Sequence, residues 1–185
     1  MRALIFVLVL AAAGPAAAQM RIDLMNRAPP IVDFARSGDA GSVRSALSSG
    51  ASPNASDLDG MPAVILAAMS GHAEVVTALV QAKAWLDVRD KMGNTALFWA
   101  AERGYDGVVE ALIAGKANLN TENRSGATPL IAAAREGHVA IVDMLVRAGA
   151  DIDRQDHTGR TALNWAQTNS RRNVVEVLRR AGARR

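Results

Sequence analysis

A period of 33 residues, kept without insertion or deletion, constrains the fold of this chain more than any other feature of its sequence. Small residues recur in register along it: Gly60, Gly93, Gly126 and Gly159; Ala67, Ala100, Ala133 and Ala166; Gly38, Gly71, Gly104 and Gly137. A strict period of this length indicates a solenoid, in which small units stack and each unit contacts only its neighbours. We therefore expect a single domain that is stabilised by stacking.

The local chemistry of one unit, residues 126–160, predicts its structure. Thr128 can cap a helix N-terminus, and Pro129 suits the first helical position because it lacks an N–H that would be unpaired there. Gly137 is expected to end this helix, and Gly149 to end a second one before an extended finger. The predicted buried stripes are Leu130, Ala133 and Ala134, then Ile141, Val142, Leu145 and Val146. Both helices are too short to be stable alone.

The segment TPLIAAAREGH, from Thr128 to His138, resembles the signature of the ankyrin repeat. The resemblance covers about residues 24–185 and implies an all-α ankyrin-repeat solenoid of about five helix-turn-helix units with β-hairpin-like finger loops. The repeats are expected at about 24–56, 57–89, 90–122, 123–155 and 156–185. The first repeat is more polar and the last carries Arg179 on its stripe, as terminal caps require.

Two departures from the family pattern concern rigidity. The histidine that follows the leucine of the signature, and that ties adjacent fingers in the family, is replaced by Ile65, Phe98, Ile131 and Asn164. We therefore expect the fingers to lack this tie. Lys83 and Lys116 replace the glycine that ends the second helix, so each is expected to adopt a left-handed conformation that costs about 1–2 kcal/mol.

Residues 1–18 have the pattern of a secretory signal peptide, with a basic start, an apolar run and small residues at the end. Cleavage is expected between Ala18 and Gln19, followed by a short leader over 19–26. The apolar run falls short of the roughly 20 residues that span a membrane, although an uncleaved anchor is the alternative. Arginine far outnumbers lysine, which we interpret as a bacterial trait. We expect a periplasmic or secreted protein without disulfides, because the chain contains no cysteine.

The C-terminal segment 160–185 is basic, with seven arginines and one acidic residue. Arg171, Arg172, Arg179, Arg180, Arg184 and Arg185 either form a docking patch for an acidic partner or an anionic membrane surface, or simply solvate the terminal cap. We favour the second interpretation, because an outer cap must be polar. Nucleic-acid binding is not expected, since the remaining body is acidic and no aromatic residues alternate with the arginines.

The sequence offers no catalytic, cofactor-binding or metal-ligating set. His72 and His138 occupy one repeat position two units apart, too distant to share a metal, and are expected to pack structurally. His157 lies beside Asp156, a common surface pair, and no serine is placed as a nucleophile with a base. We predict a protein that is not an enzyme and needs no cofactor.

Recognition of a protein partner is the function that remains. Ankyrin-like arrays bind partners on a concave surface formed by the fingers and first helices, and the resemblance places these candidates there: Met61, Met69, Trp85, Lys91, Met92, Asn94, Glu102, Arg103, Tyr105, Arg124, Arg135 and Glu136. Trp99 and Trp165 are expected to pack between units. We expect a monomer that binds an unidentified protein and has no membrane contact beyond its signal peptide. The alternatives are a regulator of an exported enzyme and a membrane-surface binder.

Overall fold

The computed structural model describes residues 28–184. The predicted signal peptide, its cleavage between Ala18 and Gln19, and the leader lie outside the described residues. The described part contains ten helices, joined as five antiparallel pairs, and no extended strand. This confirms the predicted all-α solenoid of helix-turn-helix units. Among these helices, none is long and apolar enough to cross a bilayer.

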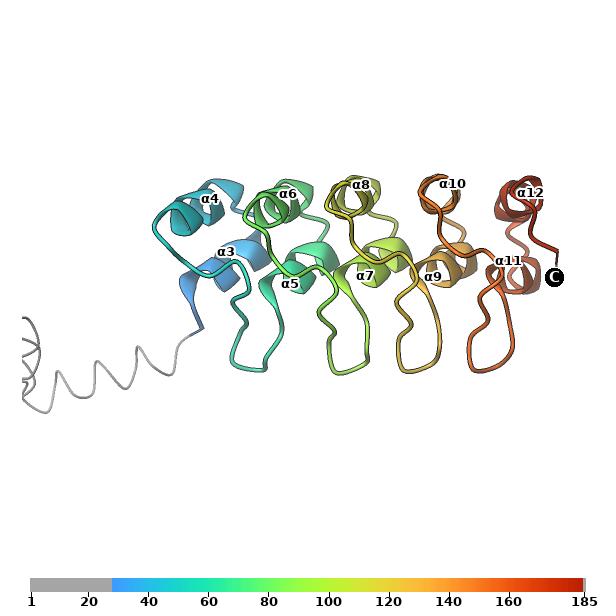
Figure 1. The fold of residues 1–185 in the computed structure, drawn as a ribbon, viewed down its shortest axis with the longest axis horizontal. Helices are drawn as coiled ribbons and strands as arrows, with labels where there is room; N and C mark the ends of the chain where they lie inside the picture. The colour runs from blue at the N-terminus through green and yellow to red at the C-terminus, as the bar shows by residue number, and fades with distance from the viewer. Residues whose placement is uncertain (1–27, 185) are drawn as a thin grey trace, which may run out of the picture.

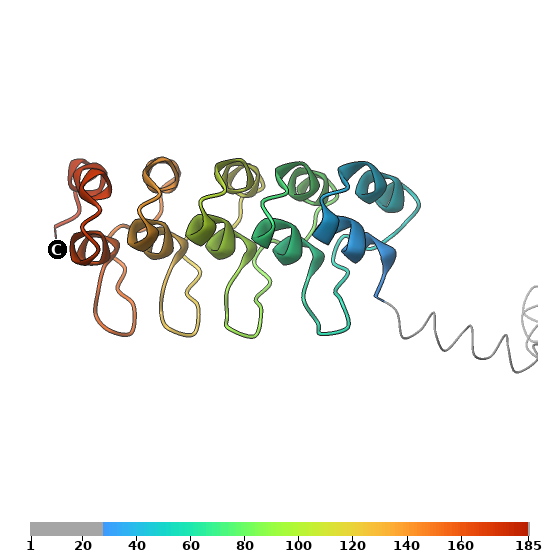
Figure 2. The same ribbon diagram turned by 180° about the vertical axis from the view of Figure 1, so that it is seen from behind.

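The helices form two parallel rows, and four finger loops project from one of them (Figures 1 and 2). The first helices of the units are α3 (Pro30–Ser37), α5 (Ala63–Met69), α7 (Ala96–Arg103), α9 (Pro129–Glu136) and α11 (Ala162–Thr168). The second helices are α4 (Ala40–Ser48), α6 (Ala73–Gln81), α8 (Asp106–Ala114), α10 (Val139–Arg147) and α12 (Arg172–Arg180). Each predicted repeat therefore holds one helix of each row.

Small and branched apolar side chains form one continuous core along the stack. The alanines at the repeated position, Ala67, Ala100, Ala133 and Ala166, are fully buried, so neighbouring first helices approach closely. In the second helix of the fourth repeat, Ile141, Val142 and Leu145 are buried as predicted, whereas Val146 is only half-buried. Stacking of these stripes stabilises helices of seven to nine residues that would be marginal alone.

The helix termini follow the predicted chemistry. The hydroxyl of Thr128 accepts a hydrogen bond from the N–H of Ile131, and Pro129 occupies the first turn. Lys83 and Lys116 have φ values of 62° and 64°, which confirms the left-handed conformation predicted for both.

Two types of hydrogen bond hold the fingers in place without the missing histidine. Within each finger, an Asp or Asn side chain accepts backbone N–H groups of the turn, as Asp57 does from Met61 at 2.8 Å. Between fingers, the N–H of Arg124 donates to the carbonyl of Met92 at 3.0 Å, and the N–H of His157 donates to that of Ser125 at 2.9 Å. The backbone thus supplies a tie between these fingers, although the family histidine is absent.

A third set of bonds links each first helix to the next unit. The Nε2–H of His72 donates to the carbonyl of Arg36 at 3.1 Å, and that of His138 donates to the carbonyl of Glu102 at 3.0 Å. These bonds satisfy carbonyls at helix C-termini that lack an intrahelical partner. Both histidines therefore have the structural role that the sequence predicted.

Candidate partner-binding surface

The finger and first-helix surface carries most of the predicted contact residues in accessible positions. The exposed members are Trp85, Lys91, Met92, Arg103 and Arg124. The half-buried members are Met61, Met69, Glu102, Tyr105, Arg135 and Glu136. The remaining residue, Asn94, is buried. Met61 and Met69 also pack against the core. Whether these residues bind a partner stays a prediction.

Asn94 is the exception, because its side chain points inward. It is 4% exposed, and its Oδ1 accepts a hydrogen bond from Nδ2 of Asn123 at 2.9 Å. Its backbone N–H donates to Asp90 Oδ1 at 2.8 Å. A residue of the second finger is thereby joined to the third, so Asn94 belongs to the scaffold and not to the contact surface.

Tyr105 occupies the repeat position that His72 and His138 hold in other units. A Cβ atom on Gly71 would lie 3.0 Å from the Tyr105 ring, so the ring packs closely on the preceding helix terminus. A phenol there makes no hydrogen bond to the free carbonyl of Met69. Instead, Nη1 of Arg103 donates to that carbonyl at 2.7 Å. Replacement of Tyr105 or Arg103 is therefore expected to disturb this junction of the stack as well as any partner contact.

Two half-buried tryptophans are held by carboxylates that precede them by nine residues. The indole N–H of Trp99 donates to Asp90 Oδ2 at 2.8 Å, and that of Trp165 donates to Asp156 Oδ2 at 2.7 Å. These polar contacts lie within one repeat, and both indoles also pack against the core. The sequence contained a signal for these bonds, because a tryptophan follows an aspartate by nine residues in just two repeats. Leu66 and Ala132 occupy the tryptophan position in repeats 2 and 4.

Guanidinium groups lie over both indole rings. The Arg103 guanidinium carbon is 5.1 Å from the centre of the Trp99 ring, and that of Arg160 is 4.8 Å from the Trp165 ring. Distances in this range allow cation–π attraction. Each indole is thus enclosed by its own finger on one side and an arginine on its face, which leaves little free aromatic surface for a partner.

Burial and hydrogen bonding act in opposite directions on Asp156, which is 8% exposed. Burial raises the pKa of its carboxyl, but hydrogen bonds from Thr158, Trp165 and Arg160 outweigh burial, and the pKa is lowered overall. Asp156 therefore stays ionised as a structural acceptor. It does not form the exposed pair with His157 that the sequence suggested.

An ion-pair network crosses the first helices of repeats 3 and 4. Nη2 of Arg135 lies 2.7 Å from Glu102 Oε1, and its Nε lies 3.0 Å from Glu136 Oε1. Glu102 and Arg135 share one repeat register, so opposite charges at successive units pair across the stack. These three predicted contact residues are already paired with one another, and a partner would have to compete with partly buried pairs.

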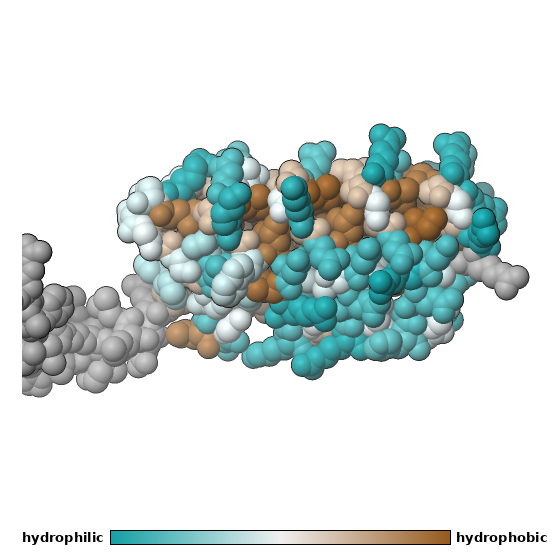
Figure 3. Space-filling view, viewed as in Figure 1, coloured by the Kyte–Doolittle hydropathy of each residue, from teal (hydrophilic) through white to brown (hydrophobic). Residues whose placement is uncertain are grey.

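The large exposed apolar side chains in the described part gather at one end of the finger surface. Leu58, Trp85 and Met92 are 71%, 67% and 63% exposed, and all three belong to the first two fingers. The finger layer in Figure 3 is otherwise mostly hydrophilic, whereas apolar colour runs along the layer of second helices. Large exposed apolar side chains on a polar surface are typical contact residues.

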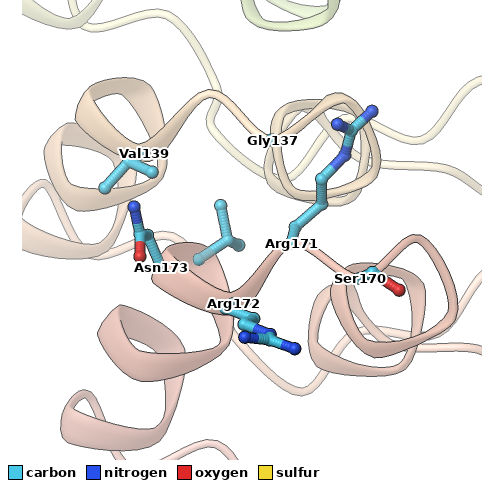
Figure 4. Close-up of a pocket in the computed structure, with 7 residues that line it drawn as sticks. Gly137, Val139, Ser170, Arg171, Arg172 and Asn173 are labelled. Carbon is cyan, nitrogen blue, oxygen red and sulfur yellow. The ribbon is translucent and has the colours of Figure 1, made fainter.

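A depression of about 300 Å³ lies at the junction of repeats 4 and 5, lined by Gly137, Val139, Arg171, Arg172 and their neighbours (Figure 4). Arg171 extends along the C-terminal end of α9, where its Nε donates to the Arg135 carbonyl at 3.2 Å. This arginine therefore continues the row of bonds made by His72 and His138. The depression therefore lies where two units stack, and one of its basic side chains, Arg171, is already hydrogen-bonded within the stack.

Within residues 28–184, no group of three histidine or acidic side chains is arranged to hold a metal ion. The surface offers charged, apolar and amide groups for contacts.

A model of the family described as "Ankyrin repeats (3 copies)" matches residues 32–123 and again residues 107–184. Together the matches include both helices of nearly every unit. Among curated proteins, no match to the chain is found.

Proposed function

Because the chain belongs to the ankyrin-repeat family, whose members are generally protein-interaction modules, we propose that it binds another protein in the periplasm or outside the cell. Binding is non-catalytic and uses the finger and first-helix surface. The proposed contact residues are those predicted from the sequence, except Asn94 and Tyr105, which belong to the scaffold. Leu58 is added to them because its side chain is exposed.

The exposure of Leu58, Trp85 and Met92 carries this proposal. A soluble domain gains nothing in its own stability from these side chains, whereas a partner that covers them removes apolar area from water. Binding energy in interfaces is concentrated in a few such residues. The first two fingers are therefore the proposed centre of the contact surface.

A crosslinking pull-down from the periplasmic fraction and the culture medium tests the proposal, with the chain that begins at Gln19 as bait. The test variant is Leu58→Ser with Met92→Ser, which removes two exposed apolar side chains. The matched control is Ala114→Ser with Ala140→Ser, two exposed positions on the second helices. A partner captured by the control and lost with the test variant supports the proposal.

Equal capture by both variants would contradict the assigned surface. An activity change in a captured enzyme would favour the regulatory alternative. Loss of capture after Arg172→Glu with Arg179→Glu, but not with the finger variant, would move the contact surface to the C-terminal cap.

A further inference from the structure

The four fingers end in matching turns at residues 57–60, 90–93, 123–126 and 156–159. The first residue of each turn is Asp or Asn, and its side chain accepts backbone N–H groups of the same turn. The fourth residue is a glycine with positive φ. The two residues between them are all exposed: Leu58 and Asp59, Lys91 and Met92, Arg124 and Ser125, His157 and Thr158.

The second positions of these turns form a row whose chemistry changes along the stack. An apolar residue, Leu58, stands at the first fingertip, and basic residues, Lys91, Arg124 and His157, stand at the other three. Within residues 28–184, none of the three basic side chains has an ion-pair partner.

The acidic residues of the three basic fingertips point inward. Asp90 and Asp156 bind backbone amides of their turns and the indoles of the following helices. The third turn begins with Asn123, which carries no charge. The outward charge of fingers two and three, carried by Lys91 and Arg124, is therefore positive, and finger four adds the imidazole of His157. The first fingertip instead exposes the acid Asp59, so the basic side chains lie only on the later fingertips of the row.

The basic fingertips are held at a set spacing. The backbone bonds from Arg124 to Met92 and from His157 to Ser125 link fingers two, three and four. No corresponding bond joins Lys91 to Asp59 in the described structure. A cleft of about 480 Å³ separates the first two fingers instead, lined by Asp59, Gly60, Met61, Arg89, Asp90 and Lys91. The rigid part of the row, visible along the lower edge of Figure 1, is thus its basic part.

We propose that this fingertip row docks an extended acidic segment of the partner protein. Carboxylates of the segment contact Lys91, Arg124 and His157 in turn, and an apolar residue at its end packs beside Leu58 and Met92. Pre-set spacing of the cations lowers the entropic cost of ordering such a segment, and charge complementarity sets its direction. This inference rests on the proposed function and specifies the chemistry of its partner.

A labelled, blocked peptide with one leucine followed by alternating glutamate and serine residues is the probe. Its binding is measured by fluorescence anisotropy at about 50 mM salt, where screening is weak. The variant Lys91→Glu with Arg124→Glu should weaken binding by about tenfold or more, because two attractive contacts become repulsive. The matched control, Arg172→Glu with Arg179→Glu, makes the same change in net charge on exposed arginines of α12 and should change binding by less than about twofold.

Equal weakening by the control would overturn the inference, because binding would then report net charge alone. So would unchanged binding of the fingertip variant, or a peptide with lysine for glutamate that binds as well. Tighter, fingertip-dependent binding of a single-stranded oligonucleotide or of vesicles with anionic lipid would overturn the assignment to a protein segment.

The pull-down separates this inference from the proposed function. A partner that the fingertip charge variant still captures leaves the proposed function standing and refutes the acidic segment. Peptide binding through the fingertips without any captured protein supports the docking of an acidic segment on the fingertip row and counts against the proposed partner in those fractions.

Discussion

The indole N–H of Trp165 donates a 2.7 Å hydrogen bond to the carboxylate of Asp156, and this bond ties helix α11 to the finger that precedes it. The same carboxylate accepts the N–H groups of Thr158 and Arg160 through its other oxygen. One buried acid thus closes the finger turn and anchors the turn to the first helix. In repeat 3, Asp90 and Trp99 make the matching arrangement.

Trp165→Phe should destabilise the domain by about 2 kcal/mol, because it leaves a buried carboxylate oxygen without its donor. Urea unfolding followed by circular dichroism measures the change. Trp85→Phe is the control, since Trp85 is 67% exposed and its side chain makes no such bond to any residue within 28–184; its effect should stay within about 0.5 kcal/mol. Similar values for both would show that the indole–carboxylate bond does not stabilise the fold.

The acid stability of the domain should depend on Asp156. Its pKa is lowered in the folded state because hydrogen bonds outweigh burial. Its contribution to the free energy of unfolding is therefore fully present above the unfolded pKa of about 3.9 and is lost as pH falls through the lower folded value. Asp156→Asn should reduce stability at neutral pH and flatten the loss of stability below about pH 4.

Urea unfolding at a series of pH values from neutral to acidic measures this dependence. Asp153→Asn is the control, because Asp153 is exposed and its carboxylate accepts no hydrogen bond among the described residues. An Asp156→Asn variant that loses stability with acid as steeply as the wild type would contradict the prediction.

Arg103→Ala should destabilise the junction of repeats 2 and 3 by about 1 kcal/mol, because the Met69 carbonyl loses its donor. In that background, Tyr105→His should recover part of the loss, since histidine at this position donates to the corresponding carbonyl in two other units. A double-mutant cycle on unfolding free energies tests the coupling. If the two substitutions destabilise the domain additively, a histidine at position 105 does not replace Arg103 as the donor to the Met69 carbonyl.

Val64→Leu should stabilise the domain by about 0.5–1 kcal/mol. A cavity of about 120 Å³ is lined by Val64, Trp85, two prolines and their neighbours. Three other units carry leucine at this position, at Leu97, Leu130 and Leu163, so the backbone accommodates the larger side chain. Val76→Leu is the control in a fully buried site and should destabilise by overpacking. A lower melting temperature for Val64→Leu would contradict the prediction.

Much of the architecture follows from the sequence alone, because its determinants lie within a few residues of one another. The Thr128 cap acts on a group three residues away, and the stripes of each helix follow its 3.6-residue period. The left-handed conformations of Lys83 and Lys116 could be predicted from their register with glycines in other units. Such local rules repeat in every unit, and the period made them easy to recognise.

The roles of individual surface residues were decided by the tertiary structure. Asn94 is buried and accepts a hydrogen bond from Asn123, which is 29 residues away, and Arg103 donates to a carbonyl 34 residues before it. The repeat register predicts which positions lie close together between neighbouring units. It does not predict which of two nearby side chains forms the hydrogen bond to a given donor or acceptor. Tyr105 makes this clear: its register predicts a hydrogen bond, its chemistry does not supply one, and the stack satisfies the Met69 carbonyl with Arg103 instead.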